Sequence, residues 1–391
     1  MRIADVSAFY TARGGGVRTY VERKLAYAEQ AGIELTVIIP SERNGIERRG
    51  RCTRLQHIAA PPLILDRRYR YFDSTAAVHA ALDDFAPDVV EASSPWRTAS
   101  IVAEWQGEAP RALVMHADPL AAYAYRWFGN VAERDTIDRG FEWFWAHLRR
   151  AARRYDIVVS ANSGLTARLR HGGLPQAATI PLGVDPGVFS PTLRDPGLRE
   201  ELLASCALGP DALLLLGVGR QAPEKRWPTI IQAVGKAGVQ RGVGLVLMGE
   251  GRDHAKLLRH IGGNPHIRML PPTSSRAEMA RMLASADALI HGCEAETFGL
   301  VAAEAAASGL PLIVPDEGGA ADQAHPDRAE TYRAGDADAA ASAIVRLADR
   351  DPAALRAAAT SAAGSARSLD DHFADLLARY TGFTQRDALR A

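Results

Sequence analysis

The chain has 391 residues, enough for two to three domains that each bury a core. Hydrophobic residues make up 47% and charged residues 24%, a balance that excludes intrinsic disorder. The 46 basic and 46 acidic residues cancel, so the net charge does not favour nucleic acid as a partner, and we expect none.

Short apolar runs alternate with segments of helical period along the whole chain, which is typical of βαβ units and parallel sheets. The predicted fold class is therefore α/β. In the first half, strands are expected near residues 2–9, 34–39, 88–92, 112–116, 157–161 and 179–181. Helices fill most of the gaps, and Asn162 is the expected N-cap of one of them.

The segment 181–191, PLGVDPGVFSP, is rich in proline and glycine, and the alternation restarts after it. We place the first domain in residues 1–185 and the second in 186–367. Strands of the second half are expected at 212–219, 244–248, 266–270, 288–291 and 312–314. Ser275 and Glu278 have the spacing of a capping box, and the sequence becomes Ala-rich and helical beyond about residue 336.

Cysteine usage and hydropathy predict a cytoplasmic protein. The three cysteines have no CxxC spacing, which favours neither a disulfide framework nor a zinc cluster. Asp5 interrupts the apolar N-terminal segment, and Glu304 interrupts the most apolar later stretch, 299–315. We therefore expect no export signal and no transmembrane helix.

Two loops carry glycine or cations directly after a predicted strand. Residues 14–16 are three glycines that follow the first strand and precede a helix, where backbone amides can approach a phosphate; a tight turn is the alternative. Arg220 and Lys225 follow the apolar run LLLLGVG and can converge on one diphosphate; an ordinary solvated loop is the alternative. Because only 4 of the 46 basic residues are lysines, each lysine merits inspection.

Two carboxylates stand eight residues apart in HGCEAETFGLVAAEAAASG. Glu296 lies in a loop, and Glu304 lies in a helix of otherwise small and apolar residues. A carboxylate in such a helix needs a partner, which the hydroxyl groups of a bound sugar could provide. A structural arginine is the alternative partner.

Taken together, these motifs resemble retaining nucleotide-sugar glycosyltransferases of glycosyltransferase family 4. The resemblance rests on Arg220 with Lys225, the ExFGxxxxE spacing from Glu296 to Glu304, SGLPLIV, the Gly318–Gly319 pair, the triple glycine, His116 in HADP, and PLGVD at 181–185. It covers most of the chain. It implies the GT-B architecture, two Rossmann-like domains facing across a cleft, with a C-terminal helix at about 368–391 that packs back on the first, acceptor-side domain.

The same resemblance implies the activity and the roles of individual residues. A hexose would pass from a nucleotide sugar, GDP-mannose or a UDP-hexose, to a hydroxyl of a glycan or lipid-linked acceptor with retention of configuration. The catalytic residues would be Arg220, Lys225, His116 and Glu296. The donor-binding residues would be Gly15, Gly16, Phe298, Gly299, Leu300 and Glu304, with Glu304 on the ribose.

No DxD pair stands at a predicted strand end, so we expect neither a metal nor a cofactor. The protein's own cations would then stabilise the leaving diphosphate. In such enzymes the leaving phosphate oxygen accepts the acceptor proton, and no carboxylate base is needed. The competing hypotheses are a nucleotide-sugar epimerase or glycan phosphorylase on the same fold, and a catalytically silent nucleotide-sugar binding protein.

Two segments combine aromatic and basic residues: FEWFWAHLRRAARRY at 141–155 and RRYRYF at 67–72. Such segments can lie in an anionic bilayer interface, with the rings buried and the arginines among the headgroups. This favours an anionic membrane surface as a further partner and a peripheral position on the inner face of the plasma membrane. A core helix with a solvated basic end is the alternative.

Overall fold

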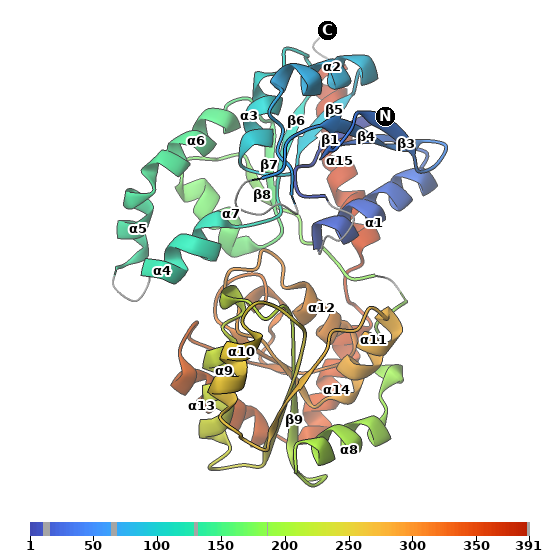
Figure 1. The fold of residues 1–391 in the computed structure, drawn as a ribbon. Coiled ribbons are helices and arrows are strands. Elements are labelled where there is room, and N and C mark those ends of the chain that lie inside the picture. Colours follow the sequence, from blue (N-terminus) through green and yellow to red (C-terminus); the bar gives the residue numbers. More distant parts are fainter. Residues whose placement is uncertain (11–15, 64–68, 129–131, 186, 389–391) are drawn as a thin grey trace. The chain divides into compact units, whose positions relative to one another are not determined.

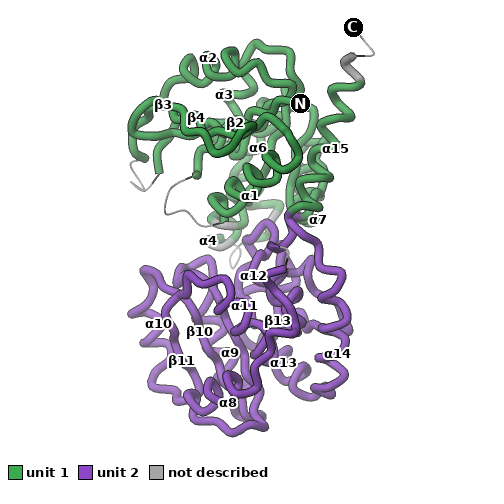
Figure 2. Tube along the Cα trace, turned by 90° about the vertical axis from the view of Figure 1, so that its right-hand side faces the viewer, with its two compact units in different colours: residues 1–181, 370–391 green, residues 182–369 purple. Residues whose placement is uncertain are grey.

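The computed structural model describes residues 1–10, 16–63, 69–128, 132–185 and 187–388. The chain forms two compact units (Figures 1 and 2). Unit 1 comprises Met1–Pro181 and Asp370–Ala391, and unit 2 comprises Leu182–Leu369. The boundary expected between residues 185 and 186 falls four residues beyond this division.

Unit 1 is built on one twisted sheet. Its described strands are β1 (Arg2–Val6), β2 (Glu34–Ser41), β3 (Gly45–Arg48), β4 (Thr53–Ala59), β5 (Val89–Ala92), β6 (Arg111–Met115), β7 (Ile157–Ser160) and β8 (Ala177–Thr179). They lie in the order β3-β4-β2-β1-β5-β6-β7-β8, and all neighbours are parallel except β3 and β4. The central strands β1 and β5 are almost wholly buried, as expected where helices cover both faces of a parallel sheet.

Helices join and cover these strands. They are α1 (Gly16–Gln30), α2 (Thr75–Phe85), α3 (Arg97–Glu104), α4 (Arg126–Phe128), α5 (Arg134–Gly140), α6 (Glu142–Ala152), α7 (Ser163–His171) and, from the end of the chain, α15 (Leu369–Ala388). A π-helical turn, Leu120–Tyr125, precedes α4. Helix α15 packs on α1 through contacts of Phe373 with Tyr20 and Tyr27. The predicted N-cap Asn162 is confirmed, because its side chain accepts from the Leu165 amide.

Unit 2 repeats the plan with a smaller sheet. Its strands are β9 (Leu213–Val218), β10 (Val243–Met248), β11 (Ile267–Leu270), β12 (Ala288–Ile290), β13 (Leu312–Pro315) and β14 (Ala329–Tyr332). All are parallel, in the order β11-β10-β9-β12-β13-β14. Its helices are α8 (Pro196–Ser205), α9 (Trp227–Ala237), α10 (His254–Ile261), α11 (Arg276–Ser285), α12 (Leu300–Ala307), α13 (Ala337–Ala348) and α14 (Pro352–Ala363).

Each sheet has one place where the strand order reverses. In unit 1 the chain adds β2, β4 and β3 on one side of β1, and then continues with β5 on the other side. In unit 2 the same reversal lies between β9 and β12. Loops that leave the carboxyl ends of such neighbouring strands diverge to opposite faces and open a crevice, which is where open α/β sheets bind ligands. These four loops are therefore where function is to be sought.

The predicted α/β class with two parallel sheets is confirmed, but three strands escaped prediction: β3, β4 and β14. β3 is an exposed edge strand, and β4 carries Arg54, Gln56 and His57, so neither shows the continuous apolar run of a central strand. The capping box before α11 is only half formed. Ser275 accepts from the Glu278 amide, but the Glu278 carboxylate binds the Thr273 hydroxyl instead of closing the box.

The aromatic segment 141–155 is partly a core helix. Phe144 and Trp145 are 2% and 5% exposed, whereas Trp143 is 60% exposed, because the helical period turns neighbouring residues to opposite faces. In the second segment, Phe72 is buried, and residues 67 and 68 lie outside the described residues. A helix with the length and apolar composition to span a membrane is not found in the described parts of the chain.

Candidate active site

The switch point of unit 2 brings two of the predicted loops together. Arg220 and Lys225 follow β9, and Glu296 follows the adjacent strand β12. The Lys225 ammonium contacts the Glu296 carboxylate, although the two residues are 71 positions apart. The Arg220 side chain is 71% exposed and donates to Glu224 at 2.9 Å. One loop thus offers a buried cation and an exposed one at the carboxyl edge of the sheet.

Burial controls the charges beneath this pair. It lowers the pKa of the Lys225 ammonium, and Arg220 adds to that effect, while Cys293 and Glu224 oppose it. His291 lies 3.3 Å from Glu296, and burial, reinforced by Lys225, lowers its pKa to about 3. His291 is therefore neutral at pH 7, and Lys225 carries the positive charge that contacts Glu296.

His291, Cys293 and Glu296 also form the one group of three candidate metal ligands in the described part of the chain. Their ligand atoms lie within 4.8 Å of one another. Burial raises the pKa of the Cys293 thiol, which disfavours the thiolate that a metal would need. Because the Lys225 ammonium already binds the Glu296 carboxylate, we assign no metal to this cluster.

Glycine allows two backbone segments to meet behind these side chains. Gly299 has φ of 74° and caps α12, and a Cβ there would lie 2.8 Å from the Ala320 backbone. Gly318 has φ of 80°, and a Cβ there would lie 2.2 Å from the Glu294 carbonyl oxygen. The loop after β13 therefore supports the loop that carries Phe298, Gly299 and Leu300, from which the N-terminus of α12 starts.

Glu304 on α12 is paired with an arginine that the sequence analysis did not identify. Arg276 at the start of α11 donates to Glu304 Oε1 at 2.8 Å and to Asp185 Oδ2 at 2.7 Å, and its guanidinium lies 4.8 Å from the Phe189 ring centre. The alternative of a structural arginine partner thus holds for one carboxylate oxygen. Burial raises the pKa of the Glu304 carboxyl, and Arg276 opposes that rise.

The resemblance implies that Glu304 holds the ribose of a nucleotide-sugar donor. On that expectation, replacing Arg276 with methionine should raise the KM for the donor about tenfold to a hundredfold, because Glu304 loses the charged hydrogen bond that orients it, and such a bond is worth about 1.5–3 kcal/mol. The pKa of Glu304 rises further in the variant. The donor KM of the variant should then fall with increasing pH, because the Glu304 carboxylate forms. The folding stability of the variant should be lost over the same pH range, because a carboxyl group whose pKa is raised in the folded state stabilises the fold only while it is protonated. Steady-state kinetics against pH would measure this.

The control is Arg281→Met on the same helix, which removes an exposed pair with Asp195. We expect its KM and pH profile to match those of the wild type. An Arg276→Met variant with an unchanged donor KM at every pH would show that Glu304 does not contact the donor.

Of the unit 1 candidates, His116 lies near the charges of a buried cluster that contains Asp5 and Lys24. His116 follows β6 and packs edge-on against Tyr20, with ring centres 4.6 Å apart; burial lowers its pKa to about 4, so it is neutral at pH 7. Gly16 is the first residue of α1, and a Cβ there would meet nothing within 4 Å. Gly15 lies outside the described residues.

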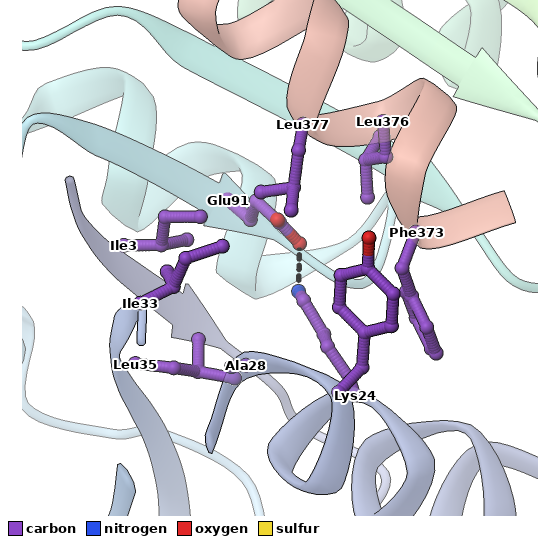
Figure 3. Close-up of a pocket in the computed structure, with 10 residues that line it drawn as sticks. Ile3, Lys24, Ala28, Ile33, Leu35, Glu91, Phe373, Leu376 and Leu377 are labelled. Atoms are coloured by element: carbon purple, nitrogen blue, oxygen red, sulfur yellow. Dashed lines mark hydrogen bonds and ion pairs between the residues drawn. The ribbon is translucent and has the colours of Figure 1, made fainter. Parts of the chain in front are cut away.

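Lys24 on α1 is the centre of that cluster. It donates to Asp5 on β1 at 2.8 Å and to Glu91, which is Asp5's partner on β5, and all three are almost completely buried. Ser93 donates to the other Asp5 oxygen at 2.6 Å. Figure 3 shows the Lys24–Glu91 pair with Phe373, Leu376 and Leu377 of α15 around it. The cluster joins both switch-point strands to α1 and α15.

Comparison with known proteins gives the family. Residues 14–188 match the family model "Glycosyltransferase Family 4", and residues 199–363 match "Glycosyl transferases group 1". A GDP-mannose-dependent alpha-(1-6)-phosphatidylinositol dimannoside mannosyltransferase of Mycobacterium tuberculosis is 31% identical over 80% of this chain and 79% of its own. A GDP-mannose-dependent alpha-mannosyltransferase of the same species is 28% identical over 84% of this chain and 82% of its own.

Solved structures share the fold. Sucrose-phosphate synthase from Thermosynechococcus elongatus superposes with a TM-score of 0.76 over 99% of this chain and 100% of its own, at 17% identity. HepE of Anabaena in complex with UDP-glucose superposes with a TM-score of 0.70 over 97% and 100%, at 15% identity. The chain belongs to glycosyltransferase family 4 and has the GT-B fold, and the prediction of a hexosyltransferase of this family is confirmed.

Proposed function

We propose that this protein is a retaining mannosyltransferase that moves mannose from GDP-mannose to a hydroxyl group of a glycolipid. The observation that carries the choice of donor is the similarity over four fifths of the chain to two enzymes described as GDP-mannose-dependent, one of which acts on a phosphatidylinositol dimannoside. The ion pair of Lys225 with Glu296 at the unit 2 switch point supports a diphosphate site in that unit.

In this proposal unit 2 binds the donor. Lys225 and Arg220 stabilise the charge that develops on the leaving GDP, helped by the backbone amides of Phe298, Gly299 and Leu300 at the start of α12. Glu296 accepts hydrogen bonds from the sugar hydroxyls. Glu304, oriented by Arg276, accepts hydrogen bonds from the ribose.

Unit 1 contributes the acceptor side. His116, kept neutral by burial, donates to or accepts from the sugar near its anomeric carbon and O6. Gly15 and Gly16 let the backbone approach the donor phosphate at the start of α1. The leaving phosphate oxygen takes the proton of the attacking hydroxyl, so no carboxylate base is needed. Arg220 and Lys225 take the place of a metal in stabilising the leaving diphosphate. We place the enzyme in the cytoplasm, peripheral on the inner face of the plasma membrane.

Thermal unfolding with GDP, UDP and ADP tests the donor. A ligand that binds only the folded state stabilises it by about 2.7 kcal/mol at a hundredfold excess over Kd, and we expect that shift with GDP and a much smaller one with the others. Mannose transfer from GDP-mannose to a phosphatidylinositol mannoside should follow. Preference for UDP, or release of free mannose or an epimer without acceptor, would contradict the proposal.

A further inference from the structure

Six aromatic side chains of unit 1 form a continuous chain of ring contacts at its surface. This aromatic band consists of Trp96, Tyr123, Trp127, Phe128, Phe141 and Trp143. Neighbouring ring centres along the band are 5.6 to 6.5 Å apart. The band extends over the π-helical turn, α4 and α6, which lie with α5 to the left of the sheet in Figure 1.

The aromatic band is exposed where a monomer would normally bury such residues. Trp127, Trp143 and Tyr123 are 59%, 60% and 55% exposed, and Phe128 is 44% exposed. Phe144 and Trp145 on the inner side of α6 already anchor that helix to the core, so the outer rings are not needed for its packing. A contiguous apolar surface of this kind marks an interaction site.

Positive charge lies beside the aromatic band. Residues 120–155 contain seven arginines and four acidic residues, a surplus of three positive charges. Arg150 shares the outer face of α6 with Trp143, and Arg153 and Arg154 are exposed just beyond its end. Glu142, the acidic residue of α6, is paired with Arg149.

We propose that the aromatic band docks unit 1 on an anionic lipid bilayer, with the rings at headgroup depth and the arginines on lipid phosphates. Tryptophan and tyrosine favour this depth because one end of each ring is apolar and the other is polar. The exposed arginines that border the rings complement the negative headgroups of an anionic bilayer, so charge and apolar surface favour the same partner. The inference rests on the proposed function only in that the acceptor is a lipid.

Sedimentation with vesicles tests the docking surface. The full chain should bind phosphatidylcholine vesicles that contain phosphatidylglycerol and bind pure phosphatidylcholine vesicles weakly. Trp127→Ser with Trp143→Ser should abolish binding. Arg150→Glu with Arg154→Glu should weaken it by at least about twentyfold, since each arginine near an anionic surface contributes about fivefold. The matched controls are Leu258→Ser, 52% exposed in unit 2, and Arg51→Glu, 93% exposed in unit 1; both should bind normally.

Tryptophan fluorescence gives an independent readout. Trp105, Trp145 and Trp227 are buried, so a blue shift on anionic vesicles reports Trp96, Trp127 and Trp143, and it should shrink in the double tryptophan variant. GDP binding and transfer to a short-chain soluble acceptor should stay unchanged in both double variants, which also shows that they are folded. If the wild type does not bind GDP, the proposed function is refuted, but the vesicle-binding result still stands.

Two outcomes would overturn the docking proposal. One is vesicle binding that is absent in the wild type or equal in wild type and the double tryptophan variant. The other is a wild type that is a dimer in solution and does not bind vesicles, together with a double tryptophan variant that is a monomer. That result would make the aromatic band an interface between copies of the chain.

Discussion

Replacing Lys225 with alanine is expected to lower kcat about a hundredfold to a thousandfold, which is the usual effect of removing one preorganised group that stabilises transition-state charge. Negative charge grows on the diphosphate as the glycosidic bond breaks, and an ammonium held in a buried site stabilises that charge more than water does. Lys225 is 12% exposed and is held by Glu296. Donor KM should change much less, because the interaction strengthens mainly in the transition state.

The control is Lys236→Ala, since Lys236 is an exposed lysine of the same unit, paired only at the surface with Asp338. It should retain full activity. Because Lys225→Ala also leaves Glu296 without its cation, thermal stability is compared with that of the double variant that adds Glu296→Gln. Recovery of stability in the double variant would show that the unpaired carboxylate, and not a wider loss of structure, destabilises the single variant. If kcat in Lys225→Ala equals that of the wild type, Lys225 does not stabilise the leaving group.

The fold class was predictable because a parallel strand that is buried on both faces requires a continuous run of apolar residues, which is visible in the sequence. The runs that became β9, β10 and β13 are continuously apolar, and the loop that carries Arg220 and Lys225 begins where the β9 run stops. Edge strands have a weaker apolar pattern. β3 is fully exposed and β4 alternates, so local sequence could not distinguish them from a loop.

The partners of buried charges were not predictable, because they meet only through the fold. Arg276 lies 28 positions from Glu304, and nothing in its local sequence distinguishes it from other arginines. The scarcity of lysine was the one useful signal. Two of the four pair with carboxylates away from the surface: Lys24 is buried and Lys225 is 12% exposed, whereas Lys236 forms an exposed pair. The direction of each aromatic ring in 141–145 likewise depends on how α6 sits on the core.

Replacing Lys24 with methionine is expected to destabilise unit 1 by about 3–5 kcal/mol, which is the cost of removing one partner from a buried ionic cluster. Asp5 and Glu91 are fully buried on adjacent strands. Among the described residues, Lys24 is the only lysine that forms an ion pair with either of them. Burial alone would lower the pKa of Lys24, but the two carboxylates outweigh it and raise that pKa. The variant would hold two facing carboxyl groups without a cation.

Glu91→Gln should cost far less, about 1 kcal/mol, the ordinary size for a point substitution. Burial raises the pKa of the Glu91 carboxyl, so removing the charge of Glu91 relieves part of the desolvation cost, and Asp5 still pairs with Lys24. Denaturant unfolding, with hydrogen exchange in β1 and β5 to locate the loss in unit 1, would measure both variants.

The pH dependence of Lys24→Met follows from the same charges. Without the ammonium, the pKa of Glu91 rises further above its unfolded value, so the folded variant favours the protonated carboxyl. Its stability is then greatest at low pH and is lost as pH rises through that raised pKa, whereas Lys24 in the wild type stays charged throughout. The deficit relative to the wild type should therefore be largest near pH 7 and shrink on acidification. A deficit that does not shrink as pH falls would mean that the charge of Lys24 is not what supports the fold.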